Sequence, residues 1–245
     1  MRVAIAAVMA AGVLTVASPA VAATVGTARA TPTIAARSAA QPRALTPVPS
    51  PVPFADVPSD AAFAAEIQWL SAQGISTGWV ENDGSRTFRP LSPVNRDAMA
   101  AFMYRFAGAP DFSPPPVSPL VDVQPTDMFF KAIIWITARQ ISTGWDDGNG
   151  GRSYRPGQPV NRDAMAAFMY RLADRPAFSP PAVSPFSDVS TDNIYYHEIT
   201  WLAAQGISTG WVEADGTRTF RPLQPVNRDA MAAFMYRFSA RPASG

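Results

Sequence analysis

One block of sequence recurs three times along this chain, at a constant spacing. The segment PVNRDAMAAFMYR is repeated without a change at 93–105, 159–171 and 225–237. The pentad ISTGW is repeated in the same register at 75–79, 141–145 and 207–211. The first and third copies, compared over 75–106 and 207–238, differ only where Asn82, Ser85 and Ser92 are replaced. Because a fixed period of this kind is the signature of a repeat architecture, the sequence predicts three similar structural units.

The beginning of the chain is typical of an export signal. Arg2 supplies a positive charge, the residues from Val3 to about Val16 are apolar, and the Ala-Val-Ala sequence of 20–22 matches the small-x-small cleavage rule. An uncleaved membrane anchor is the alternative, but the apolar run is shorter than the roughly 20 residues that a membrane-spanning helix needs. We therefore predict a signal peptide over 1–22 and no membrane span in the mature protein.

A segment rich in Ala, Thr, Pro and Arg follows over 23–53, and it lacks any apolar period. This composition predicts a flexible or polyproline-type linker. The three repeats then occupy 54–119, 120–185 and 186–245. Pro-rich connectors end the first two repeats, and Phe112 and Phe178 within them are expected to dock on the repeats.

Each repeat is predicted to fold as helix, loop and helix. In the first helix, Phe63, Ile67 and Leu70 follow the i, i+4, i+7 spacing of one helical face, and the other repeats share this pattern. Side-chain caps for the three first helices are expected at Asp60, Thr126 and Asp192. Asparagine N-caps are expected to begin the second helices, at Asn95, Asn161 and Asn227.

The second helix has a predicted buried face, which in the first copy comprises Met99, Phe102, Met103 and Phe106. An aspartate near the start of each repeat is expected to hold the following turn through side-chain-to-backbone bonds, at Asp56, Asp122 and Asp188. One hairpin of about 55 residues would bury little apolar surface alone, whereas three can bury their stripes together. We therefore predict a mainly α fold in which three helix-loop-helix repeats form one body with pseudo-threefold symmetry.

The composition excludes several chemistries. Because the chain has no cysteine, it has no disulfide, thiolate zinc site or cysteine nucleophile. A Ser-His-Asp triad would need His197, the only histidine, and no GxSxG motif supplies a nucleophile. The Asp- and Gly-rich loop over 146–150 lacks the spacing and the closing Glu of an EF-hand, so a simple turn is preferred to a calcium site. The net charge of +1 favours neither nucleic acid nor an anionic membrane surface as a partner.

Three sets of repeated residues are candidates for ligand contact. Arginines begin the second helices, where the helix dipole disfavours a cation, at Arg96, Arg162 and Arg228. They are interpreted either as bidentate partners of a ligand carboxylate or phosphate, or as ion-pair partners of a nearby aspartate. Tryptophans that can stack on a sugar ring or pack between repeats follow a loop glycine, at Trp79, Trp145 and Trp211. Arginines that can line a groove or bind a loop carbonyl precede a proline, at Arg89, Arg155 and Arg221.

The order of these motifs resembles the S-layer homology domain. The first repeat carries the pattern as Asp56-Val57, Trp69-Leu70, Gly74-Ile75, Gly78-Trp79, Asp83-Gly84, Phe88-Arg89-Pro90 and a capped helix with Arg96. All three repeats match in register, over about 54–241. The resemblance implies a pseudo-trimer of helix-loop-helix units. It also implies grooves between the units that bind secondary cell-wall polysaccharides non-covalently.

In that family the second helix opens with Thr-Arg-Ala-Glu, and the Arg contributes to ligand binding. Here the motif stands as Asn95-Arg96-Asp97-Ala98, with copies at 161–164 and 227–230. The Arg matches, whereas the missing Glu removes half of a capping box. The resemblance thus implies ligand contact for Arg96, Arg162 and Arg228, with an anionic wall polysaccharide, pyruvylated or otherwise acidic, as the ligand.

The resulting hypothesis is an exported, non-enzymatic module that anchors a protein to the bacterial cell wall. No catalytic residue, metal or cofactor is expected. Two alternatives stay open. A wall-associated hydrolase is one, because family members are often fused to such enzymes, although no carboxylate pair stands out from the repeat. An adhesin or surface-lattice protein that binds other proteins is the second.

Overall fold

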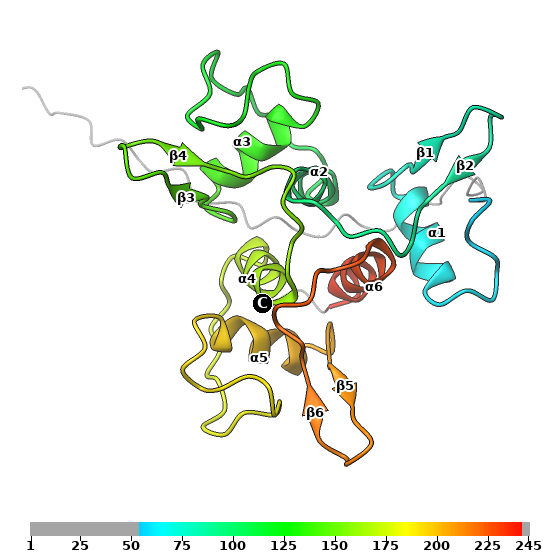
Figure 1. Ribbon diagram of the computed structural model, residues 1–245, viewed down its shortest axis with the longest axis vertical. Helices are drawn as coiled ribbons and strands as arrows, with labels where there is room; N and C mark the ends of the chain where they lie inside the picture. The colour runs from blue at the N-terminus through cyan, green and yellow to red at the C-terminus, as the bar shows by residue number, and fades with distance from the viewer. Residues whose placement is uncertain (1–53, 242–245) are drawn as a thin grey trace, which may run out of the picture. The chain divides into compact units, whose positions relative to one another are not determined.

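The computed structural model describes residues 54–241, so the signal peptide predicted over 1–22 and the linker predicted over 23–53 lie outside the described residues. Each repeat contributes a first helix, a short β-hairpin and a second helix (Figure 1). The first helices are α1 (Ala64–Ala72), α3 (Phe130–Ala138) and α5 (Tyr196–Ala204). The second helices are α2 (Arg96–Phe106), α4 (Arg162–Leu172) and α6 (Arg228–Ser239).

The loop between the two helices of each repeat contains an antiparallel pair of very short strands. The pairs are β1 (Trp79–Val80) with β2 (Arg86–Thr87), β3 (Trp145–Asp146) with β4 (Arg152–Ser153), and β5 (Trp211–Val212) with β6 (Arg218–Thr219). These hairpins correct the predicted mainly α class, because the fold combines helices with small sheets. Aromatic and β-branched residues around an Asp-Gly turn favour a hairpin, so the sequence contained this signal.

The first helices begin later than predicted. Their N-cap positions, none of which makes a side-chain cap hydrogen bond, are Phe63, Phe129 and Tyr195. Ahead of α1, the N–H of Ala61 donates to the carbonyl of Pro58, and the N–H of Ala64 donates to the carbonyl of Ala61. In α1 these turns supply the acceptors that were expected from Asp60. Ahead of α5, the N–H of Tyr195 donates to the side chain of Asn193 at 2.8 Å, and not to that of Asp192. The prediction that the helices are capped by Asp60, Thr126 and Asp192 is therefore wrong.

The second helices begin as predicted, with asparagine at the N-cap, but its side chain makes no cap hydrogen bond. In α2, the N–H of Arg96 donates to the carbonyl of Gln158, and the N–H of Asp97 donates to the carbonyl of Pro156. Both acceptors belong to the second repeat. Equivalent bonds run from α4 to the third repeat and from α6 to the first. The first two N–H groups of each second helix, which have no acceptor within the helix, are thus satisfied by a neighbouring repeat.

The helices pair between repeats. α2 packs against α3, α4 packs against α5, and α6 packs against α1. An equivalent edge-to-face contact between a tyrosine and a tryptophan crosses each pair, with ring centroids 5.3 to 5.4 Å apart, formed by Tyr104 with Trp135, Tyr170 with Trp201, and Tyr236 with Trp69. α1 and α6 come from opposite ends of the described chain, so the second helix of the last repeat packs against the first helix of the first repeat. Each packed pair therefore combines helices from two different repeats, and not the two helices of one repeat.

Three buried valines link the repeats in a closed cycle. The N–H of Val94 donates to Val226, that of Val226 donates to Val160, and that of Val160 donates to Val94, each with an N···O distance of 2.9 Å. Each valine is 1% exposed. Two repeats alone cannot complete this cycle, so the arrangement depends on all three copies.

The predicted apolar faces are buried. Ile67 and Leu70 of α1 and Met99 and Met103 of α2 are all 0% exposed, and their counterparts in the other repeats are similarly buried. The connector residues Phe112 and Phe178, together with other partly buried side chains, pack against this core, as predicted. Within residues 54–241, none of the helices combines the length and apolar character that a membrane span requires.

The aspartates near the start of each repeat bind a distant segment. Asp56 accepts the N–H of Phe88 at 2.8 Å and the N–H of Arg89 at 2.7 Å. Asp122 and Asp188 make the same pair of bonds in their repeats. The expected bonds to the backbone are present, but the expected target was wrong. The turn that follows Asp56 has its own backbone acceptor, because the N–H of Val57 donates to the carbonyl of Phe54.

Candidate functional site

Three equivalent arginine side chains bridge one repeat to the next. Arg96, at the start of α2, donates from Nε to the carbonyl of Tyr154 at 2.7 Å and from Nη2 to the hydroxyl of Ser142 at 2.8 Å. The same two bonds run from Arg162 to Phe220 and Ser208, and from Arg228 to Phe88 and Ser76. Each of these bridging arginines is only 5% exposed.

Each bridging guanidinium also stacks on the loop tryptophan of the neighbouring repeat. The distances to the ring centroid are 4.3 Å for Arg228 on Trp79, 4.4 Å for Arg96 on Trp145, and 4.3 Å for Arg162 on Trp211. We name these contacts the Trp79, Trp145 and Trp211 seams. Over 54–241, no carboxylate pairs with a bridging arginine. The ion pair considered for these arginines is therefore not what holds them, because their partners are neutral oxygens and aromatic rings.

A second arginine, from the same repeat as the tryptophan, stacks on each indole. These outer arginines are Arg89, Arg155 and Arg221, which lie 4.4, 4.3 and 4.3 Å from the ring centroids. Arg89 adopts a left-handed backbone with φ of 57°, and its N–H is held by Asp56. Each indole thus contacts guanidinium groups from two repeats, and Trp79 remains 38% exposed.

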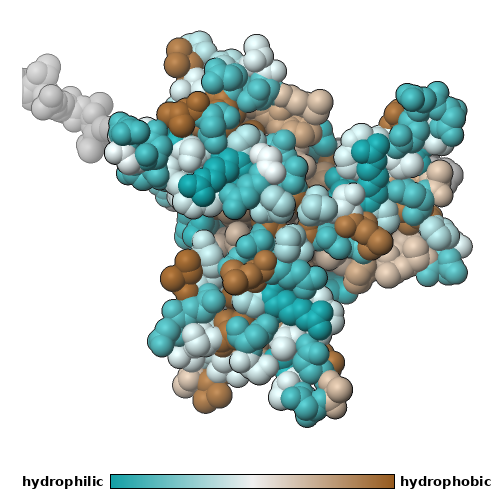
Figure 2. Space-filling view, viewed as in Figure 1, coloured by the Kyte–Doolittle hydropathy of each residue, from teal (hydrophilic) through white to brown (hydrophobic). Residues whose placement is uncertain are grey.

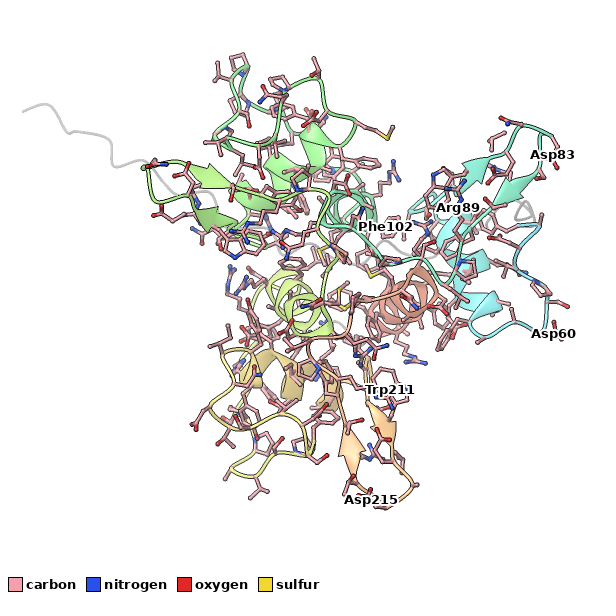
Figure 3. The ribbon with its side chains drawn as sticks, viewed as in Figure 1. Asp60, Asp83, Arg89, Phe102, Trp211 and Asp215 are labelled. Carbon is pink, nitrogen blue, oxygen red and sulfur yellow. The ribbon has the colours of Figure 1, made fainter. Side chains whose placement is uncertain are left out.

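Glutamates pair with the outer arginine at two seams. Glu81 Oε1 lies 3.0 Å from Arg89 Nη2, and Glu213 Oε1 lies 3.1 Å from Arg221 Nη2. The same glutamate oxygens accept hydrogen bonds from threonine hydroxyls on the partner strands. In Figure 3, Asp83 and Asp215 lie at the tips of their hairpins, whereas Arg89 and Trp211 lie nearer the helices.

Burial sets the electrostatics of the seams. Loss of hydration, with a smaller effect from the outer arginine nearby, lowers the pKa of Arg162 and of Arg228 to about 10. Burial likewise lowers the pKa of Arg96. Arg162 and Arg228 stay charged at neutral pH, because a pKa of about 10 remains far above 7. Arg96 is charged as well, because the guanidinium of an arginine keeps its proton in proteins. Each seam therefore holds a partly desolvated positive charge with no carboxylate in contact, which favours an incoming anion.

A cleft of about 490 Å³ lies at the Trp79 seam and draws its lining from all three repeats. The first repeat contributes 76–80 and the α2 residues Phe102 and Arg105, the second contributes Met128 and Phe129, and the third contributes Arg228. The outer Arg89 lies outside this lining. The cleft combines two guanidinium groups with aromatic and apolar surface, a set suited to a sugar that carries an acidic group.

Sequence reasoning missed two contributors to the seams. The serine of the ISTGW pentad, at Ser76, Ser142 and Ser208, is buried and accepts the hydrogen bond from a bridging arginine. Arg105 of α2 donates from Nη1 to the carbonyl of Ile75 at 3.1 Å and lines the cleft. Their presence in every copy was the available signal, because a small polar residue that never varies inside an apolar segment indicates a buried bond.

Exposed apolar side chains offer a weaker candidate surface. Val80 and Val212 on the hairpins are each 68% exposed, and Leu91 and Leu223 are 75% and 74% exposed. On the face that Figure 2 shows, exposed apolar residues form separate patches among polar ones. Scattered exposure of this kind is normal on protein surfaces. The seams are therefore the better candidate site.

Comparison with known protein families finds a match to the first and second repeats. The S-layer homology domain model matches residues 53–100 and 119–166. These stretches contain the loop tryptophan, the outer arginine and the bridging arginine of the first and second repeats. The third repeat is not matched, and a search of the curated proteins finds no match. Two stretches of the chain are therefore similar to the S-layer homology domain, and this type of domain is known for anchoring proteins to the cell wall.

Proposed function

We propose that residues 54–241 are a three-repeat S-layer homology module that binds an anionic secondary cell-wall polysaccharide non-covalently at the seams between repeats. The third repeat is included because its sequence over 207–238 is nearly identical to that of the first repeat and because it makes the same seam contacts. In this proposal the protein is exported and held at the surface of a bacterium. The predicted signal peptide over 1–22 provides the export step.

The observation that carries the proposal is the bridging arginine. It is charged, buried and stacked on a partly exposed indole, and no carboxylate contacts it within the described residues. Hydrogen bonds to a charged group are stronger than those between neutral groups, so an acidic sugar gains affinity at this position. The cleft at the Trp79 seam provides the concave surface that such a ligand requires.

We assign different roles to the three residue sets. The bridging arginines Arg96, Arg162 and Arg228 supply positive charge at the seam. The exposed parts of Trp79, Trp145 and Trp211 supply apolar surface for a sugar ring. The outer arginines Arg89, Arg155 and Arg221 extend the positive surface beyond the indole. The same constellation occurs three times, which favours a multivalent binding module over a wall hydrolase, because catalysis needs one copy of each group.

Sedimentation with cell walls tests this function. The mature protein should sediment with deproteinised sacculi that retain their secondary polysaccharide, and acid extraction of that polysaccharide should abolish the binding. Binding that survives the extraction would contradict the proposal. Because the walls carry no protein, an adhesin that recognises only proteins stays in solution. Release of soluble wall fragments over time would instead indicate the hydrolase.

A triple variant tests the bridging arginines. Arg96→Lys, Arg162→Lys and Arg228→Lys together keep three positive charges but remove the planar fork that allows bidentate pairing. We expect weaker binding to sacculi with an unchanged helical signal in circular dichroism. Unchanged binding by a folded triple variant would leave these arginines with a structural role alone.

A further inference from the structure

The three seams differ in what the outer arginine contacts. At the Trp79 and Trp211 seams, a glutamate forms an ion pair with Arg89 or Arg221. At the Trp145 seam, the guanidinium of Arg155 stacks on the indole at 4.3 Å. Over 54–241 this guanidinium forms neither an ion pair nor a hydrogen bond. Arg155 is exposed, so its donors are available to a ligand.

The cause is a local change in the second hairpin. Where the other repeats have Glu81 and Glu213, the second repeat has Asp147, whose side chain is one methylene shorter. Asp147 Oδ1 accepts the N–H groups of Asn149 and Gly151, each at 2.9 Å. The carboxylate is thus held by the backbone of its own turn. This leaves Arg155 without the partner that Arg89 and Arg221 have.

Total charge does not distinguish the seams. Each hairpin carries two carboxylates, which are Glu81 and Asp83, Asp146 and Asp147, and Glu213 and Asp215. Charges on the protein surface are largely screened beyond roughly 8 Å at physiological ionic strength. Direct contact with a carboxylate therefore matters more than the charge of the hairpin as a whole. Only the Trp145 seam presents both of its stacked guanidinium groups without such a contact among the described residues.

We propose that the Trp145 seam is the preferred of the three sites for the acidic group of the wall polysaccharide, and that Arg155 is the residue that sets this preference. This inference rests on the proposed function. At the other two seams, the anion competes with a glutamate already bound to the outer arginine. At the Trp145 seam, Arg155 and Arg96 can both interact with the anion without displacing a protein group.

Three matched variants test the preference, with binding to deproteinised sacculi measured by titration. Arg155→Gln should weaken binding about tenfold, since it removes a charged donor from the ligand. Arg89→Gln and Arg221→Gln should each weaken it less than about threefold, because those arginines are already paired. Equal losses in the three variants, or a larger loss for Arg89→Gln, would overturn the inference.

Reciprocal changes move the ion pair between seams. Asp147→Glu combined with Ser153→Thr rebuilds the glutamate and threonine of the other repeats, and it should weaken binding in the same direction as Arg155→Gln. Glu81→Gln releases Arg89 and should strengthen binding. Opposite signs would refute the role of the ion pair. Urea midpoints equal to that of the unmodified protein establish that all variants are folded.

The two proposals fail in different ways. If the unmodified protein does not bind sacculi, the wall-anchoring function is wrong, and the seam preference is wrong with it. If the unmodified protein binds but the three glutamine variants lose affinity equally, only the preference is wrong. The function then stands with three equivalent seams.

Discussion

Substitution of Arg228 by alanine should lower the free energy of unfolding by about 2 kcal/mol. This figure is the stability lost with the contacts of Arg228, less the desolvation cost that its removal relieves. Its guanidinium donates to the carbonyl of Phe88 at 2.7 Å and to the hydroxyl of Ser76 at 3.0 Å. Hydrogen bonds from a charged donor contribute about 1.5 kcal/mol each, and stacking on Trp79 contributes about 1 kcal/mol. Burial of the Arg228 charge has a desolvation cost, which is the main cause of its lowered pKa of about 10. Removal of the charge relieves this cost and offsets about 2 kcal/mol of the lost stability.

Urea unfolding, followed by far-UV circular dichroism and tryptophan fluorescence, measures this change. With a slope of about 2 kcal/mol per molar urea, the midpoint should fall by about 1 M. Agreement between the two signals is needed for a two-state analysis. Ser76→Ala is the matched control and should shift the midpoint less, since it removes one of the two hydrogen-bond acceptors.

The comparison with Arg162→Ala tests the closure of the module. Arg228 bonds to Phe88, 140 positions away in the sequence, whereas Arg162 bonds to Phe220, 58 positions away. The two arginines otherwise make equivalent contacts. We therefore expect equal losses of stability. A loss confined to Arg162→Ala would show that the third repeat does not pack on the first in solution. A midpoint shift below about 0.25 M for Arg228→Ala would refute the energetic reasoning.

Three further predictions concern the backbone and pH. In thermal unfolding, Gly78→Ala should lower the free energy of unfolding by more than about 2 kcal/mol, because φ is 67° and a β-carbon would overlap the carbonyl of Thr87. Gly74→Ala is the control and should lower it by about 1 kcal/mol, because Gly74 has the same φ but open space around it. Gln140→Gly should raise the urea midpoint by about 0.2 M, since glycine adopts the observed φ of 56° more easily; a lower midpoint would contradict this reasoning. Burial raises the pKa of Asp97, so the folded protein binds this proton more tightly than the unfolded chain, and the resulting stability is lost as pH rises through the folded-state pKa. The free energy of unfolding of the unmodified protein, relative to that of Asp97→Asn, should therefore fall as the pH rises above about 4, the ordinary pKa of an aspartate, and a constant difference would argue against a raised pKa.

Much of the fold could be predicted from local patterns. The apolar spacing of Met99, Phe102 and Met103 placed one face of α2 in the core, and Asn95 marked the start of the helix. The start of α1 could not be predicted in this way. Backbone turns replaced the side-chain cap expected from Asp60, and turns of this kind leave no strong signal in side-chain chemistry.

The candidate site was predicted as a set of residues, but not as a set of contacts. Trp79 and Arg89 lie in one repeat, and their stacking is local enough to be expected from the hairpin. Arg228 stacks on the same ring from the third repeat, which no local pattern specifies. The free guanidinium of Arg155 depends in turn on how Asp147 is held by its own turn, and that required the structure.

Three copies of one element, each with a helix start, an apolar face and a loop tryptophan, can be recognised in the amino-acid sequence. Which copies contact one another follows only from the folded arrangement of all three. Identical copies have identical local preferences, so no residue pattern distinguishes a bond within a repeat from the same bond to the next. The cycle of Val94, Val160 and Val226 requires a donor and an acceptor from every repeat. Which repeats bond to each other is therefore decided when all three repeats form this closed cycle together.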